Sequence, residues 1–179
     1  FGRHRKIQAA YPMEYLCLDI KYVWVAGEKR NYYLLTVLDV YSRMAIDQIL
    51  QASIKKIDVI NMFRRINVRY GIKGVTVRND NGSQFIANEV KQFLASSEAK
   101  QEFTHIATPQ ENSYIEAFHS IVNTEVVERF DFLSYYEAKQ TFKKHFQWYN
   151  TERKHGQIGR ITPLQKWNQY WNGIFASSG

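Results

Sequence analysis

Three acidic residues, Asp19, Asp80 and Glu116, occur at positions where a carboxylate needs an explanation. Asp19 lies inside an apolar run with strand character, where aspartate is depleted and an unpaired buried charge is costly. Asp80 directly follows a short buried strand, at the strand end where α/β sheets commonly place their sites. Glu116 lies in the middle of a polar helix face. If the three met, their oxygens would suit Mg²⁺ or Mn²⁺, and two such ions would support phosphoryl transfer.

Each of these acids also has a simpler explanation. Asp19 could pair with Lys21 on the same strand face, Asp80 could belong to an ordinary turn at Asn81-Gly82, and Glu116 could be a solvated surface carboxylate. Competing catalytic patterns are absent from the sequence: it has no serine–histidine or cysteine–histidine pairing and no glycine-rich phosphate loop, and its five histidines lack zinc-ligand spacing. A metal site therefore depends on a fold that brings the three acids together.

The elements that would have to position these acids form an α/β pattern. Runs with strand character cover 15–25, 31–40, 43–51, 75–77 and 101–106, and helical spacing covers 54–70 and 85–95. Short turns join the first three strands, so we expect them to pair antiparallel, while helices connect the others as parallel crossovers. The sequence therefore predicts a mixed five-stranded sheet, three strands antiparallel plus two parallel, flanked by helices.

The helix that carries Glu116 is predicted to begin at Thr108, with Pro109 in its first position and Glu111 completing a capping box. Helical spacing then separates two faces of this segment. Its apolar row is Ile115, Phe118, Val122 and Val126, and its polar row is Asn112, Glu116, His119 and Asn123. We place the chemistry on the polar row.

Two further capping boxes predict helices near the C-terminus. One at Ser134 opens a helix to about Asn150, and one at Thr162 opens a short helix that carries Trp167 and Trp171. We expect all four tryptophans to be core or interface residues rather than base-stacking groups; they are Trp24, Trp148, Trp167 and Trp171.

Composition indicates a single packed domain with a polyanionic partner. The chain has 179 residues, of which 45% are hydrophobic and 15% aromatic, and its net charge is +7. Nucleic acid is the commonest partner of such a basic chain, and an anionic membrane surface is the next. The sequence contains no run of transmembrane length and no signal peptide, and the single Cys17 favours an intracellular setting without an internal disulfide.

Several motifs together resemble a known family. The stretches LDIKYV, RNDNGSQF and PQENSYIEAFHSIVNTE are similar to the DDE catalytic core of retroviral-integrase-like transposases, especially bacterial insertion-sequence enzymes. Thirty-five residues lie between Asp80 and Glu116, as between the family's second aspartate and its glutamate. Further residues match the family's motifs in order: Gly82, Gln84, Phe85, Asn112, Glu125, Tyr149, Asn150, Arg153, His155, Thr162 and Pro163.

This resemblance implies a ribonuclease-H-like fold in which Asp19, Asp80 and Glu116 bind two Mg²⁺ or Mn²⁺ ions. It also implies that metal-activated water cuts a strand at the end of a mobile element, and that the freed 3′-hydroxyl attacks target DNA. The implied partners are double-stranded DNA and further copies of the chain, in a cytoplasmic, nucleoid-associated setting without a membrane. Residues 1–10 would be a basic linker or arm, 11–130 the catalytic core, and 131–179 its C-terminal helical extension.

Two positions depart from the family pattern. Lys21 stands where a threonine is usual, and Asn123 stands where a basic residue is usual. Lys21 would place a cation beside Asp19, and Asn123 would replace an electrostatic DNA contact by a hydrogen bond. The residues expected to contact DNA are Lys21, Asn112, His119, Asn123, Arg153 and His155. The open alternatives are another ribonuclease-H-like nuclease, such as one that cleaves RNA–DNA hybrids, or a DNA-binding relic that no longer cuts.

Overall fold

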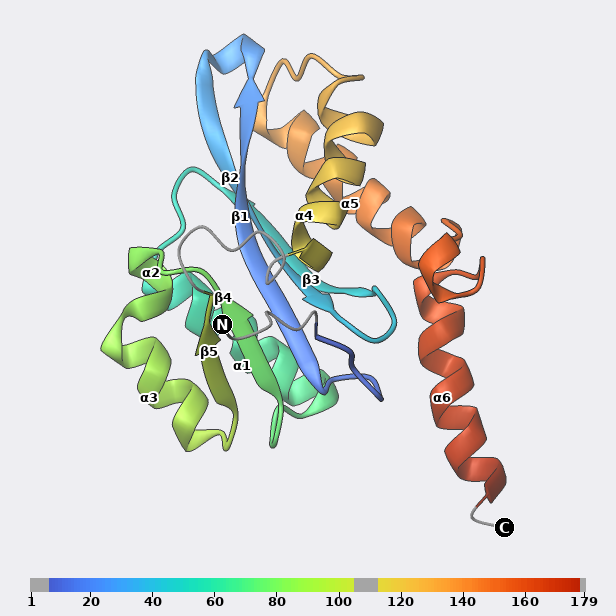
Figure 1. Ribbon diagram of the computed structural model, residues 1–179. Helices are drawn as coiled ribbons and strands as arrows, with labels where there is room; N and C mark the ends of the chain where they lie inside the picture. The colour runs from blue at the N-terminus through green and yellow to red at the C-terminus, as the bar shows by residue number, and fades with distance from the viewer. Residues whose placement is uncertain (1–6, 105–112, 178–179) are drawn as a thin grey trace, which may run out of the picture.

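The computed structural model describes residues 7–104 and 113–177, which are built around a mixed sheet with the strand order β3-β2-β1-β4-β5 (Figure 1). The strands are β1 (Tyr15–Val25), β2 (Arg30–Asp39), β3 (Ala45–Gln51), β4 (Thr76–Asn79) and β5 (Lys100–Phe103). β1, β2 and β3 pair antiparallel, whereas β4 runs parallel to β1 and β5 runs parallel to β4. The predicted sheet of three antiparallel and two parallel strands is therefore confirmed.

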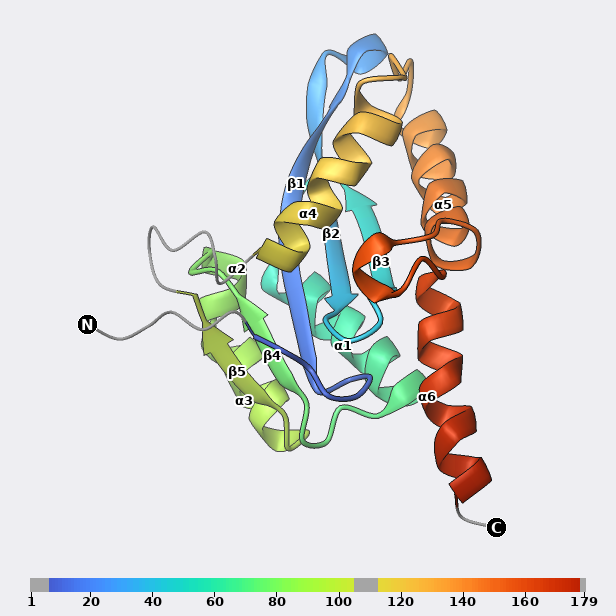
Figure 2. The same ribbon diagram turned by 45° about the vertical axis from the view of Figure 1, so that its right-hand side comes forward.

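Helices cover both faces of this sheet. The helices are α1 (Lys56–Tyr70), α2 (Ser83–Ile86), α3 (Asn88–Ser96), α4 (Ser113–Val122), α5 (Tyr135–Thr151) and α6 (Pro163–Ser177). Figures 1 and 2 show α1 and α3 on one face and α4 and α5 on the other, while α6 extends away from the body of the molecule. None of the described helices is both long and apolar enough to span a bilayer.

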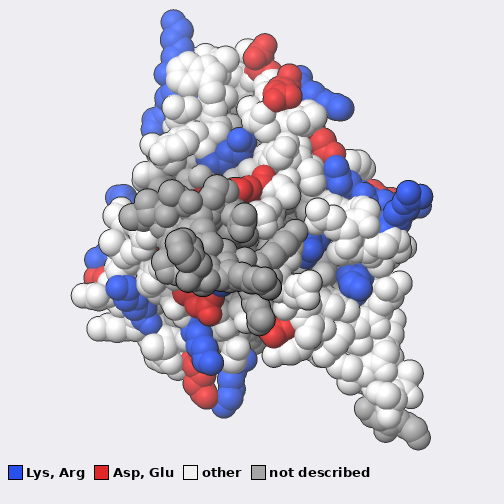
Figure 3. Space-filling view, in the orientation of Figure 1, with Lys and Arg blue, Asp and Glu red and all other residues white. Residues whose placement is uncertain are grey.

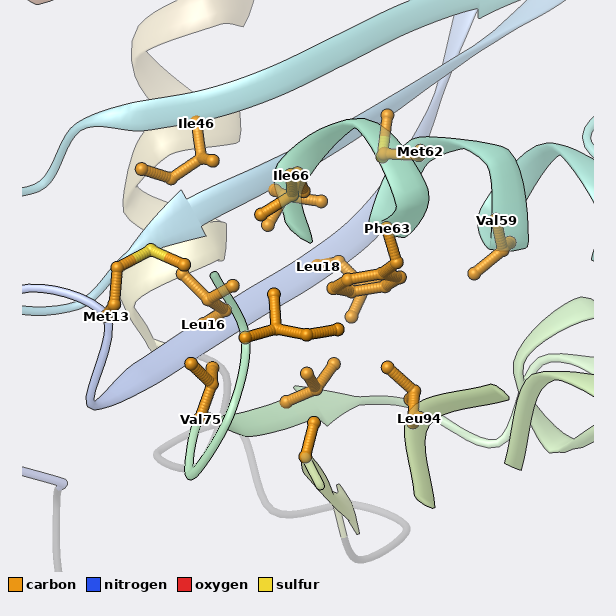
Figure 4. Packing of buried hydrophobic residues seen from close by; sticks show 14 of the residues in the cluster. Met13, Leu16, Leu18, Ile46, Val59, Met62, Phe63, Ile66, Val75 and Leu94 are labelled. Carbon is orange, nitrogen blue, oxygen red and sulfur yellow. The ribbon is translucent and has the colours of Figure 1, made fainter. Parts of the chain in front are cut away.

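Alternation along the strands creates a separate apolar core on each face. In β1, Leu16 and Leu18 pack with the α1 side, whereas Cys17 and Val23 pack with the α4 side. Figure 4 shows Phe63 of α1 lying over Leu18 within the first of these cores. The predicted apolar row of the Glu116 helix, from Ile115 to Val126, is buried in the second core, as expected.

β1 and β2 continue beyond their neighbours as a two-stranded ribbon. They pair along their whole length, but β4 pairs with β1 only over Tyr15–Cys17, and β3 ends opposite Tyr33. We call residues 22–33, at the far end of this pair, the outer ribbon. In Figure 1 it rises above the region that α1, α2 and α3 cover.

Three predicted features differ in the structure. The helix expected over 85–95 is two helices, because the backbone of Ala87 is extended, and Gln101 instead satisfies the carbonyl of Phe85 by donating a hydrogen bond of 3.0 Å. The helix predicted over 54–70 leaves Ile57 exposed, although helical spacing groups it with Ile60 and Phe63, which are buried. The last helix, expected to be short, has 15 residues.

Helix caps near the C-terminus follow the sequence signals. The Ser134 hydroxyl accepts a hydrogen bond from the Glu137 amide, and the Thr162 and Gln165 side chains accept from one another's amides. The expected cap at Thr108, Pro109 and Glu111 lies outside the described residues. After α4 the chain forms a π-helical turn, Asn123–Val127, which the sequence pattern did not predict.

The expectation that the tryptophans are core or interface residues holds for Trp167, which is buried in the first core. Trp24 and Trp148 are not core residues, because Trp24 is 53% exposed on the outer ribbon and Trp148 is 44% exposed on α5. Alternation explains Trp24, because its side of β1 has no covering helix beyond Ile20.

Candidate active site

Asp19 occupies the edge of β1 just beyond the point where β4 stops pairing with it. Its carboxylate accepts a hydrogen bond of 2.7 Å from the Ile20 amide, and 28% of its side chain is exposed. Since the sheet neighbour is missing at this point, the strand edge opens into a cavity of about 500 Å³. Asp19 therefore lies at a strand edge that something outside the sheet can approach.

Asp80 lines the same cavity from the end of β4. Its carboxylate accepts a hydrogen bond of 2.9 Å from the Gly82 amide, which closes a tight turn. A Cβ atom on Gly82 would lie 2.5 Å from the Gln84 side-chain amide and 3.0 Å from the Asp80 carboxylate, so a larger residue at this position would displace the Gln84 side chain. Asp80 therefore both closes an Asx-Gly turn and lines the candidate site, so one role does not exclude the other.

Glu116 lies on the exposed side of α4, and its charge reaches Asp19. Burial, with smaller contributions from the negative charges of Asp80 and Glu116, raises the pKa of Asp19 to about 6, although the Ile20 hydrogen bond and the Lys21 charge act in the opposite direction. Within residues 7–104 and 113–177, however, no three acidic, histidine or cysteine side chains are grouped as metal ligands. The structure thus gathers the acids into one electrostatic neighbourhood without assembling them into a ligand shell.

The donor set fits a hard divalent cation. Carboxylate oxygens are the ligands that Mg²⁺ and Mn²⁺ prefer, and the region offers no sulfur ligand because Cys17 is buried in the core. Burial and like-charge repulsion disfavour the ionised form of Asp19. A cation bound beside Asp19 would offset the like-charge repulsion that contributes to this penalty.

His119 and Lys21 border the acids from two elements. His119 Nδ1 lies 3.5 Å from an Asp19 oxygen, and its Nε2 is buried without a hydrogen-bond partner among the described residues. Burial and the nearby Lys21 charge lower the pKa of His119 to about 4, so the imidazole is neutral at neutral pH. Lys21 is half-buried and close enough for its charge to act on both residues, as the sequence led us to expect.

Arg153 and His155 have partners within the protein. Arg153 Nε donates to Glu125 at 2.7 Å, and His145 Nε2 lies 2.9 Å from the other oxygen of the same carboxylate. His155 is buried, with its ring 4.8 Å from that of Tyr149. These contacts account for both residues without DNA, and their contact with DNA stays a prediction.

The neighbouring family-matched residues fasten α5 to the sheet. Tyr149 donates a hydrogen bond of 3.0 Å to the Arg43 carbonyl, and the Asn150 amide pairs with both backbone groups of Ala45 at 2.9 Å. In the sequence, Tyr149 and Asn150 were recognisable only as matches to the family's motifs, and no sequence pattern predicted a role for His145. Its spacing from Glu125 gave no signal, because the two meet through packing of separate elements.

Asn123 and Asn112 are the other two residues predicted to contact DNA. The Asn123 amide donates to Glu128 within the segment that follows α4, so one of its donors is used internally. Asn112 lies outside the described residues.

The fold and these positions define an integrase-type core. The profile described as "Integrase core domain" matches residues 9–109, a second profile of the same description matches residues 97–163, and the chain belongs to this family. One similar protein is named as an integrase, ORF3 of Spiroplasma virus SpV1-C74, with 28% identity over 156 residues, 75% of this chain and 41% of the relative. Another is named as the transposase InsK of insertion sequence IS150 from Escherichia coli K12, with 22% identity over 92% of this chain and 58% of the relative. The chain therefore spans about half the length of these relatives.

Solved structures with the same fold are retroviral integrases. A chain of the simian T-cell lymphotropic virus intasome, solved in complex with PP2A regulatory subunit B56 gamma, has a TM-score of 0.73 at 13% identity, over 92% of this chain and 57% of that one. The HTLV-2 integrase catalytic core with magnesium has a TM-score of 0.68 at 16% identity, over 88% of this chain and 98% of that one. The predicted ribonuclease-H-like fold is therefore confirmed.

Proposed function

We propose that this chain is the catalytic core of a DNA transposase or integrase. It would cut a strand at the end of a mobile element and join the resulting 3′-hydroxyl to target DNA. The observation that carries this proposal is the gathering of three acids from β1, the end of β4 and α4: burial, together with the negative charges of Asp80 and Glu116, raises the pKa of Asp19 to about 6. Structural ion-pair networks also shift pKa values, but this network contains three carboxylates and one lysine, so it is not a balanced set of ion pairs.

Asp19, Asp80 and Glu116 are the proposed ligands of Mg²⁺ or Mn²⁺, with two ions expected when DNA is bound. Such ions would activate the attacking oxygen and stabilise the leaving one. Lys21 supplies a positive charge beside Asp19, where it would contact a phosphate of the strand being cut. His119 is neutral at this position and would orient Asp19 or the sugar–phosphate backbone without adding charge.

The proposed partners are double-stranded DNA and other copies of the chain. The net charge of +7 favours a polyanion. Among the structural neighbours, one belongs to an intasome, and the HTLV-2 core is described in dimeric and trimeric forms. We infer that this chain also assembles on DNA, close to the bacterial nucleoid.

A strand-joining assay with Mn²⁺ and DNA that mimics the element's ends tests this function. We expect Asp80→Asn to abolish cutting and joining, because it removes a charged ligand, while salt-sensitive DNA binding stays close to wild type. Asp131→Asn, on an exposed loop, is the matched control and keeps full activity.

The products of this assay decide between the alternatives. Joining through the 3′-hydroxyl supports a transposase, whereas cleavage of RNA–DNA hybrids alone supports another nuclease of this fold. Binding without any cutting by the wild-type chain supports a relic. An Asp80→Asn variant that cuts as fast as wild type would remove the proposed site.

A further inference from the structure

The outer ribbon exposes an aromatic face that the proposed chemistry does not use. Tyr22 is 65% exposed and Trp24 is 53% exposed, and both project from the same side of β1. Tyr33 lies directly opposite Tyr22 on β2, with ring centroids 5.2 Å apart. The other side of the ribbon is covered, because Val23, Val25 and Tyr32 are buried in the core that α4 and α5 cover.

This aromatic face is continuous with the candidate active site. Tyr22 and Tyr33 line the same cavity of about 500 Å³ as Asp19 and Asp80. Alternation places Asp19 and Tyr22 on opposite sides of β1, and both line this cavity at the strand edge that β4 leaves unpaired. A strand whose phosphate lay at the acids could therefore continue directly onto the rings.

The ribbon that carries these rings is held in place at its tip. The Gly27 amide donates to the Phe132 carbonyl at 3.1 Å, and Glu28 hydrogen-bonds both the Tyr32 hydroxyl and the Tyr135 amide. A Cβ atom on Gly27 would lie 2.0 Å from the Leu133 carbonyl oxygen, so this close contact needs glycine. The platform is therefore pre-organised, and binding to it does not require the ribbon to become ordered.

Charge at the ribbon favours a polyanion over an apolar protein surface. Lys29 and Arg30 are exposed at the tip, and Lys21 lies at the base beside Asp19. Figure 3 shows basic side chains at the outer end of this part of the molecule. The one acid at the tip, Glu28, is already engaged by Tyr32 and Tyr135. By strand alternation Lys21 and Arg30 lie on the side of the ribbon opposite Tyr22 and Trp24, and the Arg30 guanidinium lies 5.0 Å from the centre of the Tyr32 ring. Exposed aromatic rings on an element that also carries cations are the combination that binds single-stranded nucleic acid.

Spacing favours unpaired bases over a stacked duplex. Residues two apart on a strand are about 6.6 Å apart. Neighbouring nucleotides of one strand of B-DNA advance by only about 3.4 Å. Successive bases could lie on Tyr22 and Trp24 only if the strand were unstacked. We propose that Tyr22, Trp24 and Tyr33 form a stacking platform for unpaired bases of a DNA strand end that enters the active site. This inference rests on the proposed function and adds a substrate-contact surface to it.

Binding of short single-stranded oligothymidylate in EDTA tests the platform separately from catalysis. We expect Trp24→Ala and Tyr22→Ala each to weaken this binding about tenfold, since each removes the stacking of one base. Binding of a blunt duplex should change by less than about twofold, because phosphate contacts dominate there. Trp24→Phe keeps a ring and should retain most of the affinity, and Tyr136→Ala, on the exposed start of α5, is the control.

A fluorescent base gives a direct readout of stacking. With 2-aminopurine in the overhang of a tailed duplex, the wild-type chain should quench its fluorescence, and Trp24→Ala should lose most of that quenching while its thermal unfolding temperature stays unchanged. Equal loss of single-strand and duplex binding would overturn the platform, as would unchanged binding by both alanine variants. If Trp24→Ala weakened self-association but not DNA binding, the platform would also be overturned, and the aromatic face would be a protein interface instead.

The two proposals fail in different ways. Normal single-strand binding by Trp24→Ala, together with an inactive Asp80→Asn, would remove the platform and leave the transposase chemistry intact. Loss of single-strand binding by Trp24→Ala, in a chain that joins no DNA under any condition, would leave a single-strand binding surface without the proposed reaction.

Discussion

At the scale of single residues, Asp19 carries the energetic signature of the site. Its side chain is mostly buried, faces two other acids and lies 3.5 Å from a histidine that is neutral at neutral pH. Its ionised form is therefore disfavoured in the folded chain relative to the unfolded one. The cost of ionising Asp19 links the stability of the protein to both pH and divalent cations.

Asp19→Asn is expected to stabilise the metal-free protein at pH 7.5. The folded-state pKa of about 6 exceeds the ordinary value of 3.8, so the stability that Asp19 contributes is fully present below pH 3.8 and is lost as pH rises through 6. Above that pH the cost is on the order of 3 kcal/mol, from about 1.4 kcal/mol per pKa unit. Denaturant unfolding at pH 4 and pH 7.5 measures the difference, with Asp131→Asn as the exposed control. Equal stability of wild type and Asp19→Asn at pH 7.5 would refute this assignment.

Magnesium should have the complementary effect. Because the cation stabilises ionised Asp19, Mg²⁺ should raise the unfolding temperature of the wild type more at pH 7.5 than at pH 5. The Asp19→Asn variant should lose most of this increase. A scan in which both proteins respond equally to Mg²⁺ would place cation binding elsewhere.

At the scale of elements, packing of α5 against the turn after α4 gives the family signature a structural role. Glu125, in the π-helical turn, is held by His145 and Arg153 at 2.9 and 2.7 Å. Burial alone would raise the pKa of Glu125, but the hydrogen bonds from His145 and Arg153 outweigh it and lower the pKa. The contacts tie the far end of the helix that carries Glu116 to α5.

Glu125→Ala is expected to lower the free energy of unfolding by about 2 kcal/mol at neutral pH, because it leaves Arg153 and His145 without their shared acceptor. This contribution is present above the ordinary carboxyl pKa of 4.5 and is lost as pH falls below it. Glu89→Ala, which breaks the exposed pair with Lys56, should leave the free energy of unfolding nearly unchanged, because an exposed ion pair contributes little. Similar losses in chemical denaturation of the two variants would contradict the structural role of Glu125.

At the scale of the whole molecule, the shape suggests a surface for assembly. The helix α6 extends from the body and ends in exposed apolar side chains, of which Phe175 is 75% exposed and Ile174 is 38% exposed (Figure 1). Two element ends must be handled together in the proposed reaction, so more than one copy of the chain is needed. An apolar projection of this kind fits contact between copies.

Light scattering with end-mimicking DNA tests this assembly. We expect a multimer for the wild type and a shift toward the monomer for a chain with Ile174→Ser and Phe175→Ser together. Because both side chains are exposed, the double substitution should leave the unfolding temperature nearly unchanged. A strict monomer of the wild type, with DNA bound, would contradict the prediction.

The sequence by itself determined the sheet and most helices, and it named three acids as the candidate site. Strand alternation, capping boxes and the spacing of Asp80 and Glu116 are local properties, and each can be read without knowing which elements meet. The same local signals failed at Ala87, where a hydrogen bond from Gln101 on another element ends a helix. The division into arm, core and extension stays a prediction.

Tertiary structure alone decided what surrounds each of these residues. It placed Asp19 at an open strand edge, buried His155 against Tyr149 and paired His145 with Glu125. It also left Trp24 exposed, although a core or interface position was predicted for it. The reason is physical: burial and pKa depend on which elements pack over a position, and that packing joins residues far apart in the chain. A sequence pattern shows which side of a strand a residue occupies, but only the folded chain shows whether a helix covers that side.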